Sequence, residues 1–414
     1  MKVLVGVRCL IQPKTGIGHY TEELLGAMSQ LPEAPMMSRF PGSGLLCLTR
    51  LGLHTAKTLK SWTRGLFSGK PAQGRLGASG GHPGWLEKVY DKLLERELNS
   101  GKYDLYHEPN YFAHPTSLPT IVTVCDLSAL MHPDWHPADR VRRHDQLFRW
   151  LVPSGAHFLT ISEFVKNEMI QVLGIDSRRI HVTCCGVREH LRPLSREALD
   201  VGLKRLGLPK GYFLHVGTVE PRKNLGLLLR AWADLPIKLR SRHPLVLVGG
   251  IGWEDASTLD LLHDLKPKGL IHLGYLAEED LPVVYGGARA FVYPSHYEGF
   301  GMPPVEMLAC GGAVLSAPAG AVEEVASPAA HIIRSTDIGD WREALAEIAT
   351  DNDWHDQLTS RALETASRHT WKRCAELTLM GYQKTLDRNA LANHATSPVS
   401  GASEGAKQQK SHAA

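Results

Sequence analysis

Short apolar runs alternate with amphipathic stretches along most of this chain. The runs have the length of buried strands, and the stretches between them repeat apolar residues at the spacing of one helix face. The strands predicted in the first half are 3–7, 104–107, 121–124 and 158–161, and those in the second half are 213–216, 245–248, 271–273, 290–293 and 313–316. Strands that alternate with helices predict parallel sheets with crossover connections. Two successive sets predict an α/β fold of two Rossmann-like domains.

The break between the domains is expected between Gly186 and Tyr212, where no strand pattern occurs and proline and glycine recur. We therefore expect a first domain over residues 1–190 and a second over 205–370, followed by a helix over 371–391. Residues 395–414 lose hydrophobic periodicity and are rich in Ser, Ala, Gly, Lys and Gln, a composition that predicts disorder. Ligands of such sheets bind at the carboxyl ends of the strands, so the cleft between the domains is the predicted site.

Two carboxylates, Glu298 and Glu306, flank a Gly-Phe-Gly turn that follows the predicted strand 290–293. Glycines let a ligand approach the backbone, and the helix expected to begin near Pro303 favours an anion such as a diphosphate at its start. Glu306, placed in the first turn of that helix, and Glu298 then become candidate acceptors of ribose and sugar hydroxyls. The alternative is that Glu306 only complements the helix dipole and Glu298 is a solvated loop residue.

Arg222 and Lys223 form a second candidate group, between the strand 213–216 and the apolar helical pattern that begins at Leu225. The forked donors of an arginine and the compact charge of a lysine can stabilise negative charge on a departing nucleotide. A solvated basic pair at a helix start is the alternative.

The first half of the chain offers weaker candidates. The turn at Gly16 and Gly18 opens a helical pattern, and such a turn can serve a ligand or close packing alone. Asp126 follows the strand 121–124, where it could orient an acceptor hydroxyl or hold donor hydroxyls. His107 and Glu108 end the preceding strand and are candidates for polar contacts at the site, although a capping or hydrogen-bonded core histidine is at least an equal reading for His107.

Several of these stretches resemble the family-4 retaining glycosyltransferases. The segment from Glu298 to Glu306 is similar to the family's Glu-x7-Glu signature, and Gly217–Leu225 is similar to its phosphate-contacting loop. The other matching stretches are Lys2–Val7, Thr15–Gly18, Thr123–Ser128, Thr160–Phe164 and Cys185–Val187. The resemblance spans roughly residues 1–390.

This resemblance implies the GT-B fold, with two Rossmann-like domains facing across a cleft and the last helix crossing back to the first. It implies catalytic roles for Glu298, Arg222, Lys223 and Asp126. It implies donor-binding roles for Gly16, Gly18, Thr218, Arg222, Lys223, Gly299, Phe300, Gly301 and Glu306, and for the adjacent His19. The chain departs from the family at Thr218, where many relatives carry arginine, and at Cys125, where many carry histidine. Arg222 must therefore supply the missing arginine, and any role of that histidine is in doubt.

The resemblance also implies the reaction, which is transfer of a sugar from a nucleoside diphosphate to a saccharide hydroxyl with retained configuration. Residues 126–137 look like bacterial O-antigen and polysaccharide mannosyltransferases, so mannose from GDP-mannose, in cell-surface polysaccharide or lipopolysaccharide synthesis, is the expected donor. A glucosyl- or rhamnosyltransferase of the same fold is the alternative. An NAD-dependent oxidoreductase or epimerase is the alternative of another class, but neither glycine turn has the Gly-x-Gly-x-x-Gly pattern.

Composition limits the other possibilities. No apolar stretch approaches 18 residues, and the apolar part of the amino terminus is too short for a signal peptide, so we expect a cytoplasmic protein. The odd cysteine count, seven, without Cys-x-x-Cys spacing indicates reduced thiols, and a net charge of +3 is too small for a nucleic-acid protein. Asp351-Asn352-Asp353 reads as a turn and helix cap, not as a metal motif. We therefore expect no metal and no cofactor besides the donor substrate.

The stretch between Glu33 and Glu87 contains no acidic residue but many basic ones. Within an insertion at about 39–75, helical spacing gathers Leu and Trp62 on one side and cations on the other. The cations and the tryptophan assigned to the membrane or acceptor side are Lys57, Lys60, Trp62 and Arg64. Such a helix can lie on an anionic membrane, so a lipid-linked acceptor and a peripheral position on the inner face of the cytoplasmic membrane are predicted. The alternative is that its apolar stripe packs on the first domain.

Overall fold

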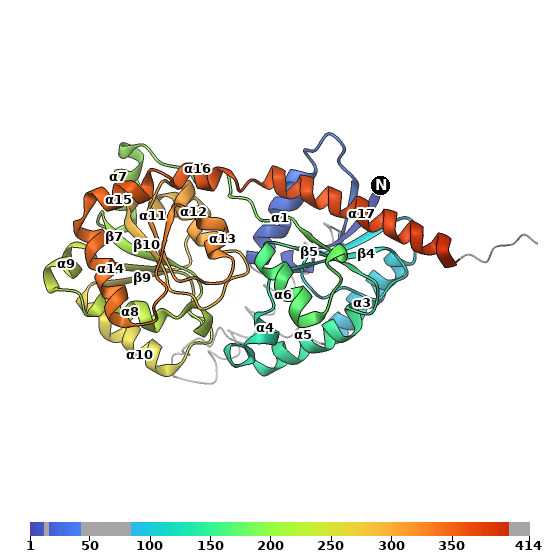
Figure 1. Cartoon of the computed structure of the whole chain (residues 1–414), viewed down its shortest axis with the longest axis horizontal. Helices are drawn as coiled ribbons and strands as arrows, with labels where there is room; N and C mark the ends of the chain where they lie inside the picture. Colours follow the sequence, from blue (N-terminus) through green and yellow to red (C-terminus); the bar gives the residue numbers. More distant parts are fainter. Residues whose placement is uncertain (12–15, 43–83, 397–414) are drawn as a thin grey trace, which may run out of the picture.

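The computed structural model describes residues 1–11, 16–42 and 84–396, which form two parallel six-stranded sheets (Figure 1). The first sheet has the order β2-β1-β3-β4-β5-β6. Its strands are β1 (Lys2–Gly6), β2 (Met36–Phe40), β3 (Leu105–Glu108), β4 (Thr120–Val124), β5 (His157–Thr160) and β6 (Ile180–Val182). The central strands β3 and β5 are buried along their whole length, as expected when helices cover both faces of a parallel sheet.

Helices connect these strands. They are α1 (Gly16–Met28), α3 (Gly84–Leu98), α4 (Ser128–Met131), α5 (Ala138–Leu151) and α6 (Glu163–Leu173). The start of α6 is fixed by Ser162, whose side-chain oxygen accepts a hydrogen bond from the Val165 amide at 3.2 Å. Gly174 ends the helix in the left-handed conformation, with φ of 63°.

The second sheet has the order β12-β11-β10-β7-β8-β9. Its strands are β7 (Tyr212–Val216), β8 (Leu245–Val248), β9 (Leu270–Gly274), β10 (Ala288–Tyr293), β11 (Val314–Ser316) and β12 (Ala330–Ile332). The accompanying helices are α7 (Arg196–Leu206), α8 (Leu225–Ala233), α9 (Ile237–Arg242), α10 (Ala256–Leu265), α11 (Leu281–Gly287), α12 (Met302–Ala309), α13 (Val322–Ala326), α14 (Ile338–Thr350), α15 (Asn352–Thr359) and α16 (Ala362–Ser367). We call the parts that carry the two sheets the first and second domains. The residue boundaries predicted from the sequence stay a prediction.

The last helix, α17 (Trp371–Thr396), crosses from the second domain to the first, as predicted. Figure 1 shows it running from α16 past α1 and the first sheet. Its start is packed against the segment between β6 and α7, where a Cβ on Gly186 would lie 2.2 Å from the Trp371 amide nitrogen. Only glycine fits this approach of two backbones.

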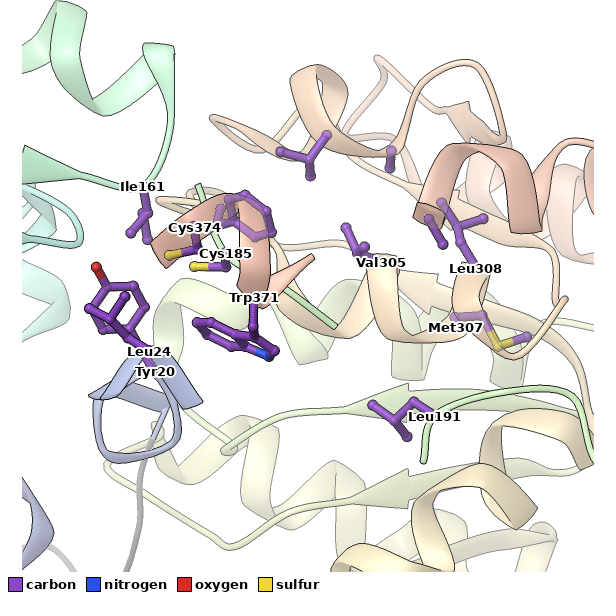
Figure 2. Close-up of a cluster of buried hydrophobic side chains, with 14 of the residues drawn as sticks. Tyr20, Leu24, Ile161, Cys185, Leu191, Val305, Met307, Leu308, Trp371 and Cys374 are labelled. Atoms are coloured by element: carbon purple, nitrogen blue, oxygen red, sulfur yellow. The ribbon is translucent and has the colours of Figure 1, made fainter. Parts of the chain in front are cut away.

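Apolar side chains from both domains meet at this crossing (Figure 2). The labelled cluster comprises Tyr20 and Leu24 of α1, Ile161, Cys185, Leu191, three residues of α12 (Val305, Met307 and Leu308), and Trp371 and Cys374 of α17. A continuous core at this point therefore joins the two domains.

Nine predicted strands occur as β1, β3, β4, β5, β7, β8, β9, β10 and β11. The prediction omitted three strands, β2, β6 and β12, and each lies at the edge of its sheet. The described cysteines are free, in agreement with the expected reduced thiols. Asp351 caps α15 by accepting a hydrogen bond from the Trp354 amide at 2.9 Å, which confirms the turn-and-cap reading of that segment.

Candidate active site

Glu298 lies between two cations at the carboxyl ends of β7 and β10. Arg222 Nη1 donates to one carboxylate oxygen of Glu298 at 2.7 Å, and Lys223 Nζ donates to the other at 2.7 Å. Lys223 also donates to the Tyr293 hydroxyl at 2.8 Å, and Arg222 donates through Nη2 to Glu220 at 2.7 Å. The predicted strand-to-helix loop therefore joins the predicted Gly-Phe-Gly loop, and the solvated-loop alternative for Glu298 is wrong.

The site is buried and its charges are matched. Glu298 is 6% exposed and Lys223 7% exposed. Burial alone would raise the pKa of Glu298, but the charges of Arg222 and Lys223 overcome it and lower that pKa to about 2. Burial lowers the pKa of Lys223, although the charge of Glu298 opposes it. An ionised Glu298 holds both cations in place.

Glu306 is also buried, at 6% exposure, but it lies in the second turn of α12 and not in the first as predicted. The helix begins at Met302, one residue before the expected Pro303, because Gly301 with φ of 99° serves as its N-cap. Arg188 donates to one oxygen of Glu306 at 2.9 Å, and the Tyr285 hydroxyl donates to the other at 2.8 Å. Each carboxylate oxygen keeps the capacity to accept a further hydrogen bond, as a ribose hydroxyl would donate.

The glycines of the turn are required by packing within the protein. A Cβ on Gly299 would lie 1.9 Å from the Cys125 carbonyl oxygen, and a Cβ on Gly301 would lie 2.8 Å from the Val322 side chain. The close approach at Gly299 is therefore made by the backbone of the first domain. Phe300, between the two glycines, is buried with its ring edge-on to His369 at 5.4 Å.

Asp126 follows β4 and faces this turn, because the neighbouring Cys125 carbonyl touches Gly299. One of its oxygens accepts hydrogen bonds from the Ser128 amide at 3.0 Å and from the Ser128 hydroxyl at 2.7 Å. His136 Nε2 lies 3.0 Å from that hydroxyl, and burial lowers the pKa of His136 to about 4. The predicted acceptor-side acid is thus brought to the predicted donor side.

The remaining donor-side candidates come from the start of α1 and from the loop after β7. Gly16 is the exposed first residue of α1, whereas Gly18 is buried. His19 Nδ1 lies 3.3 Å from Glu278 of the second domain, and Glu278 also pairs with Arg188 at 3.3 Å. Thr218 follows β7, and its methyl group would lie 2.8 Å from a Cβ on Gly252.

His107 and Glu108 are core residues of the first domain. His107 is bonded to the Tyr382 hydroxyl at 2.7 Å and to the Thr123 hydroxyl at 2.8 Å, and burial lowers its pKa to about 3. Burial raises the pKa of Glu108 to about 7. The core reading of His107 is therefore the correct one.

Sequence reasoning missed three residues of this region, Arg188, Tyr297 and Glu168. Tyr297 donates through its hydroxyl to Glu168 of α6, which joins the two domains. Glu168 carried a signal, since an acid stands beside Val165 and Met169 on the buried face of a helix. No local signal identified Arg188.

Lys57, Lys60, Trp62 and Arg64 lie outside the described residues, as do the predicted membrane-facing insertion beyond residue 42 and the predicted disordered tail beyond residue 396. Within the described ranges, no helix combines the length and apolarity that a membrane crossing needs. Within the same ranges, no three His, Cys, Asp or Glu side chains gather as metal ligands.

Two family models match the chain. The one described as "Glycosyl transferases group 1" matches residues 204–365, and the one described as "Glycosyltransferase Family 4" matches residues 74–190. The O-antigen chain mannosyltransferase B of Escherichia coli is 31% identical over 389 residues, a match that covers 92% of this chain and 100% of that protein. A D-inositol 3-phosphate glycosyltransferase of Stackebrandtia nassauensis is 28% identical over 292 residues, covering 67% of this chain and 64% of that protein.

Solved structures show the same two-domain fold. WaaG, a glycosyltransferase involved in lipopolysaccharide biosynthesis, superposes with a TM-score of 0.65 at 12% identity, covering 91% of this chain and 98% of its own. Sucrose-phosphate synthase from Thermosynechococcus elongatus gives 0.66 at 17% identity, covering 95% of this chain and 99% of its own. The predicted GT-B fold is confirmed.

Proposed function

The chain belongs to the glycosyltransferases of group 1 and family 4, and on this premise we propose that it transfers mannose from GDP-mannose to a saccharide hydroxyl with retained anomeric configuration. The product belongs to cell-surface polysaccharide or lipopolysaccharide synthesis. Similarity to an O-antigen chain mannosyltransferase along that protein's full length supports this choice of donor and product. Membership of the family overturns the NAD-dependent alternative.

The pairing of Arg222 and Lys223 with Glu298 carries the proposal. In the reaction, the bond from the sugar C1 to the diphosphate breaks and a bond from the acceptor oxygen to C1 forms. The acceptor proton passes to the departing phosphate oxygen. The negative charge that grows on the diphosphate is stabilised by the two cations, which are already oriented and shielded from water.

The other candidate residues take the following places. Asp126 orients the acceptor hydroxyl, and Glu306 accepts hydrogen bonds from the ribose. Donor contacts beyond Arg222 and Lys223 come from Gly16, Gly18, Thr218, Gly299, Phe300 and Gly301. Because two protein cations supply the positive charge that a divalent ion supplies elsewhere, the transfer needs no metal.

The acceptor is a lipid-linked saccharide at the inner face of the cytoplasmic membrane. This part of the proposal rests on the acid-free basic stretch between Glu33 and Glu87.

Thermal-shift measurements with GDP, UDP, ADP and dTDP test the donor. GDP at about 100 times its dissociation constant should stabilise the protein by roughly 2.7 kcal/mol, and the others should do less at the same concentration. A larger shift with UDP or dTDP contradicts GDP-mannose and favours the glucosyl or rhamnosyl alternative. Incubation with GDP-mannose and a mannose-terminated saccharide, followed by NMR of the new linkage, then tests retention.

A further inference from the structure

Tyr297 reaches from the second domain into the first. It is 3% exposed, and its hydroxyl donates to Glu168 of α6 and accepts a hydrogen bond from the Leu127 amide at 3.1 Å. Its ring lies edge-on to Phe164 at 5.6 Å and to His132 at 5.8 Å. All four partners belong to the first domain, so this side chain is oriented entirely from across the domain interface.

The backbone of the same residue belongs to the candidate active site. The Tyr297 carbonyl accepts a hydrogen bond from Arg222 Nη1 at 2.9 Å, and the Arg222 carbonyl accepts one from the His296 amide at 2.9 Å. Glu298 is the next residue in the chain. A displacement of Tyr297 therefore moves Glu298 and the guanidinium of Arg222 together.

Other contacts already hold α6 against the second domain. The carboxylate of Glu324 accepts hydrogen bonds from the Glu163 and Phe164 amides, both at 3.0 Å, and so caps the helix from the opposite domain. The Ser162 hydroxyl donates to the Gly299 carbonyl at 2.7 Å. The Tyr297 hydroxyl is thus not needed to bring the domains together, and its bond acts on the position of one loop.

We propose that the Tyr297 hydroxyl is a positioning group for sugar transfer, which fixes the loop of Glu298 and Arg222 when the two domains are together. Glu168 and the Leu127 amide are its anchors on the first domain. Tyr297 acts through its neighbours and is not itself a catalytic residue. This inference rests on the proposed roles of Glu298 and Arg222.

Four variants test the inference: Tyr297→Phe, Glu168→Ala, Glu168→Gln and the double variant Tyr297→Phe with Glu168→Ala. Tyr297→Phe and Glu168→Ala should each lower kcat by about tenfold to a hundredfold, the cost of a misplacement near 1 Å. GDP affinity should stay within about twofold, since no charge that meets the diphosphate is removed. Glu168→Gln should restore most of kcat because its amide oxygen still accepts from the tyrosine. The double variant should be no slower than the worse single variant, because both remove one interaction.

Tyr103→Phe is the matched control. Tyr103 donates to Glu97 at 2.6 Å before β3, at the opposite end of the first sheet, so this variant loses the same kind of bond and should keep its activity. A Tyr297→Phe enzyme with normal kcat overturns the inference, and so does a double variant whose loss is the product of the two single losses. If Tyr297→Phe does not fold, the contrast between Glu168→Ala and Glu168→Gln decides in the same way.

The two proposals fail differently. Rates are compared with wild type on whichever nucleotide sugar the wild type uses, so a donor other than GDP-mannose defeats the proposed donor and leaves the positioning role measurable. A Glu298→Gln enzyme with normal kcat contradicts the proposed role of that carboxylate. If the Tyr297→Phe enzyme is nevertheless slow, Tyr297 acts by positioning Arg222 and not Glu298.

Discussion

Glu298→Gln tests the paired charges of the site most directly. Glutamine keeps the shape and the hydrogen-bond acceptor but removes the negative charge that Arg222 and Lys223 share at 2.7 Å each. The buried Lys223 and the half-buried Arg222 then lose their shared carboxylate, and Glu220 remains as the carboxylate in contact with Arg222. Removing one partner from a buried ionic group is costly because the other charge stays uncompensated.

The pKa of Glu298 gives the magnitude. Burial acts to raise it, yet the two cations lower it from 4.5 to about 2. Each pKa unit corresponds to about 1.4 kcal/mol, so the ionised carboxylate contributes roughly 3 kcal/mol to the free energy of unfolding. Since the folded pKa lies below the ordinary value, the contribution is fully present above pH 4.5 and disappears as the pH falls through about 2.

At pH 7, the free energy of unfolding of the Glu298→Gln protein should therefore be about 3 kcal/mol lower than that of the wild type. For a domain of this size, this lowers the thermal unfolding midpoint by roughly 6–12 °C. The deficit should be the same at pH 5. GDP should stabilise the variant more than the wild type, because its diphosphate replaces the missing negative charge and no longer competes with a carboxylate. Calorimetry with and without GDP measures both effects.

Glu323→Gln is the matched control, since Glu323 pairs with Arg334 on the surface of the same domain at 42% side-chain exposure. It should change stability by less than about 1 kcal/mol. A Glu298→Gln protein as stable as wild type, with an equal response to GDP, refutes the reasoning from paired charges.

Four further outcomes are expected. Glu306→Gln should weaken GDP binding by about 1.5–3 kcal/mol, the range for hydrogen bonds to charged groups, and unchanged affinity in titration calorimetry rules out the ribose assignment. Lys223→Ala should lower kcat more than it raises KM, and an effect on KM alone contradicts a role of Lys223 in the departure of the phosphate. Transfer by the wild-type enzyme should survive EDTA, and activity that EDTA abolishes and Mn²⁺ restores contradicts metal independence. The protein should sediment with phosphatidylglycerol liposomes at low salt and be released at high salt. Replacing Lys57, Lys60 and Arg64 by Glu should abolish this sedimentation. If wild type and triple variant sediment equally, the basic stretch packs on the first domain instead.

Most of the fold followed from local patterns because central strands of parallel sheets are continuous apolar runs. The three omitted strands fail this rule for a physical reason. Edge strands have one neighbour and are partly exposed, so β2 contains Ser38 and Arg39 and β12 contains the exposed His331. Their pairing is fixed by the sheet beside them, which a local window does not contain.

The site was predictable where one stretch of chain carries it. The loops of Arg222 and Glu298 were each recognisable, but their ion pair joins residues 76 positions apart and depends on how β7 lies beside β10. The contact of Tyr297 with Glu168 spans 129 positions and depends in addition on how the domains meet. Glu306 lies one residue deeper in α12 than predicted, just past the first turn, because Gly301, as N-cap, starts the helix one residue before the proline that marked it in the sequence.

The satisfied charges of the described site have a consequence for donor binding. Both cations are already paired with carboxylates, Arg222 with Glu220 and Glu298 and Lys223 with Glu298, so a diphosphate competes with these carboxylates for the same donors. In the proposed reaction, each bond that leaves Glu298 frees a carboxylate oxygen beside the phosphate, where it can accept a hydrogen bond from a sugar hydroxyl. On the proposed function, one residue thus keeps the cations oriented before the donor binds and receives the sugar afterwards. The exchange leaves few buried charges unpaired at any stage, and this is why a carboxylate is tolerated in a site built to bind an anion.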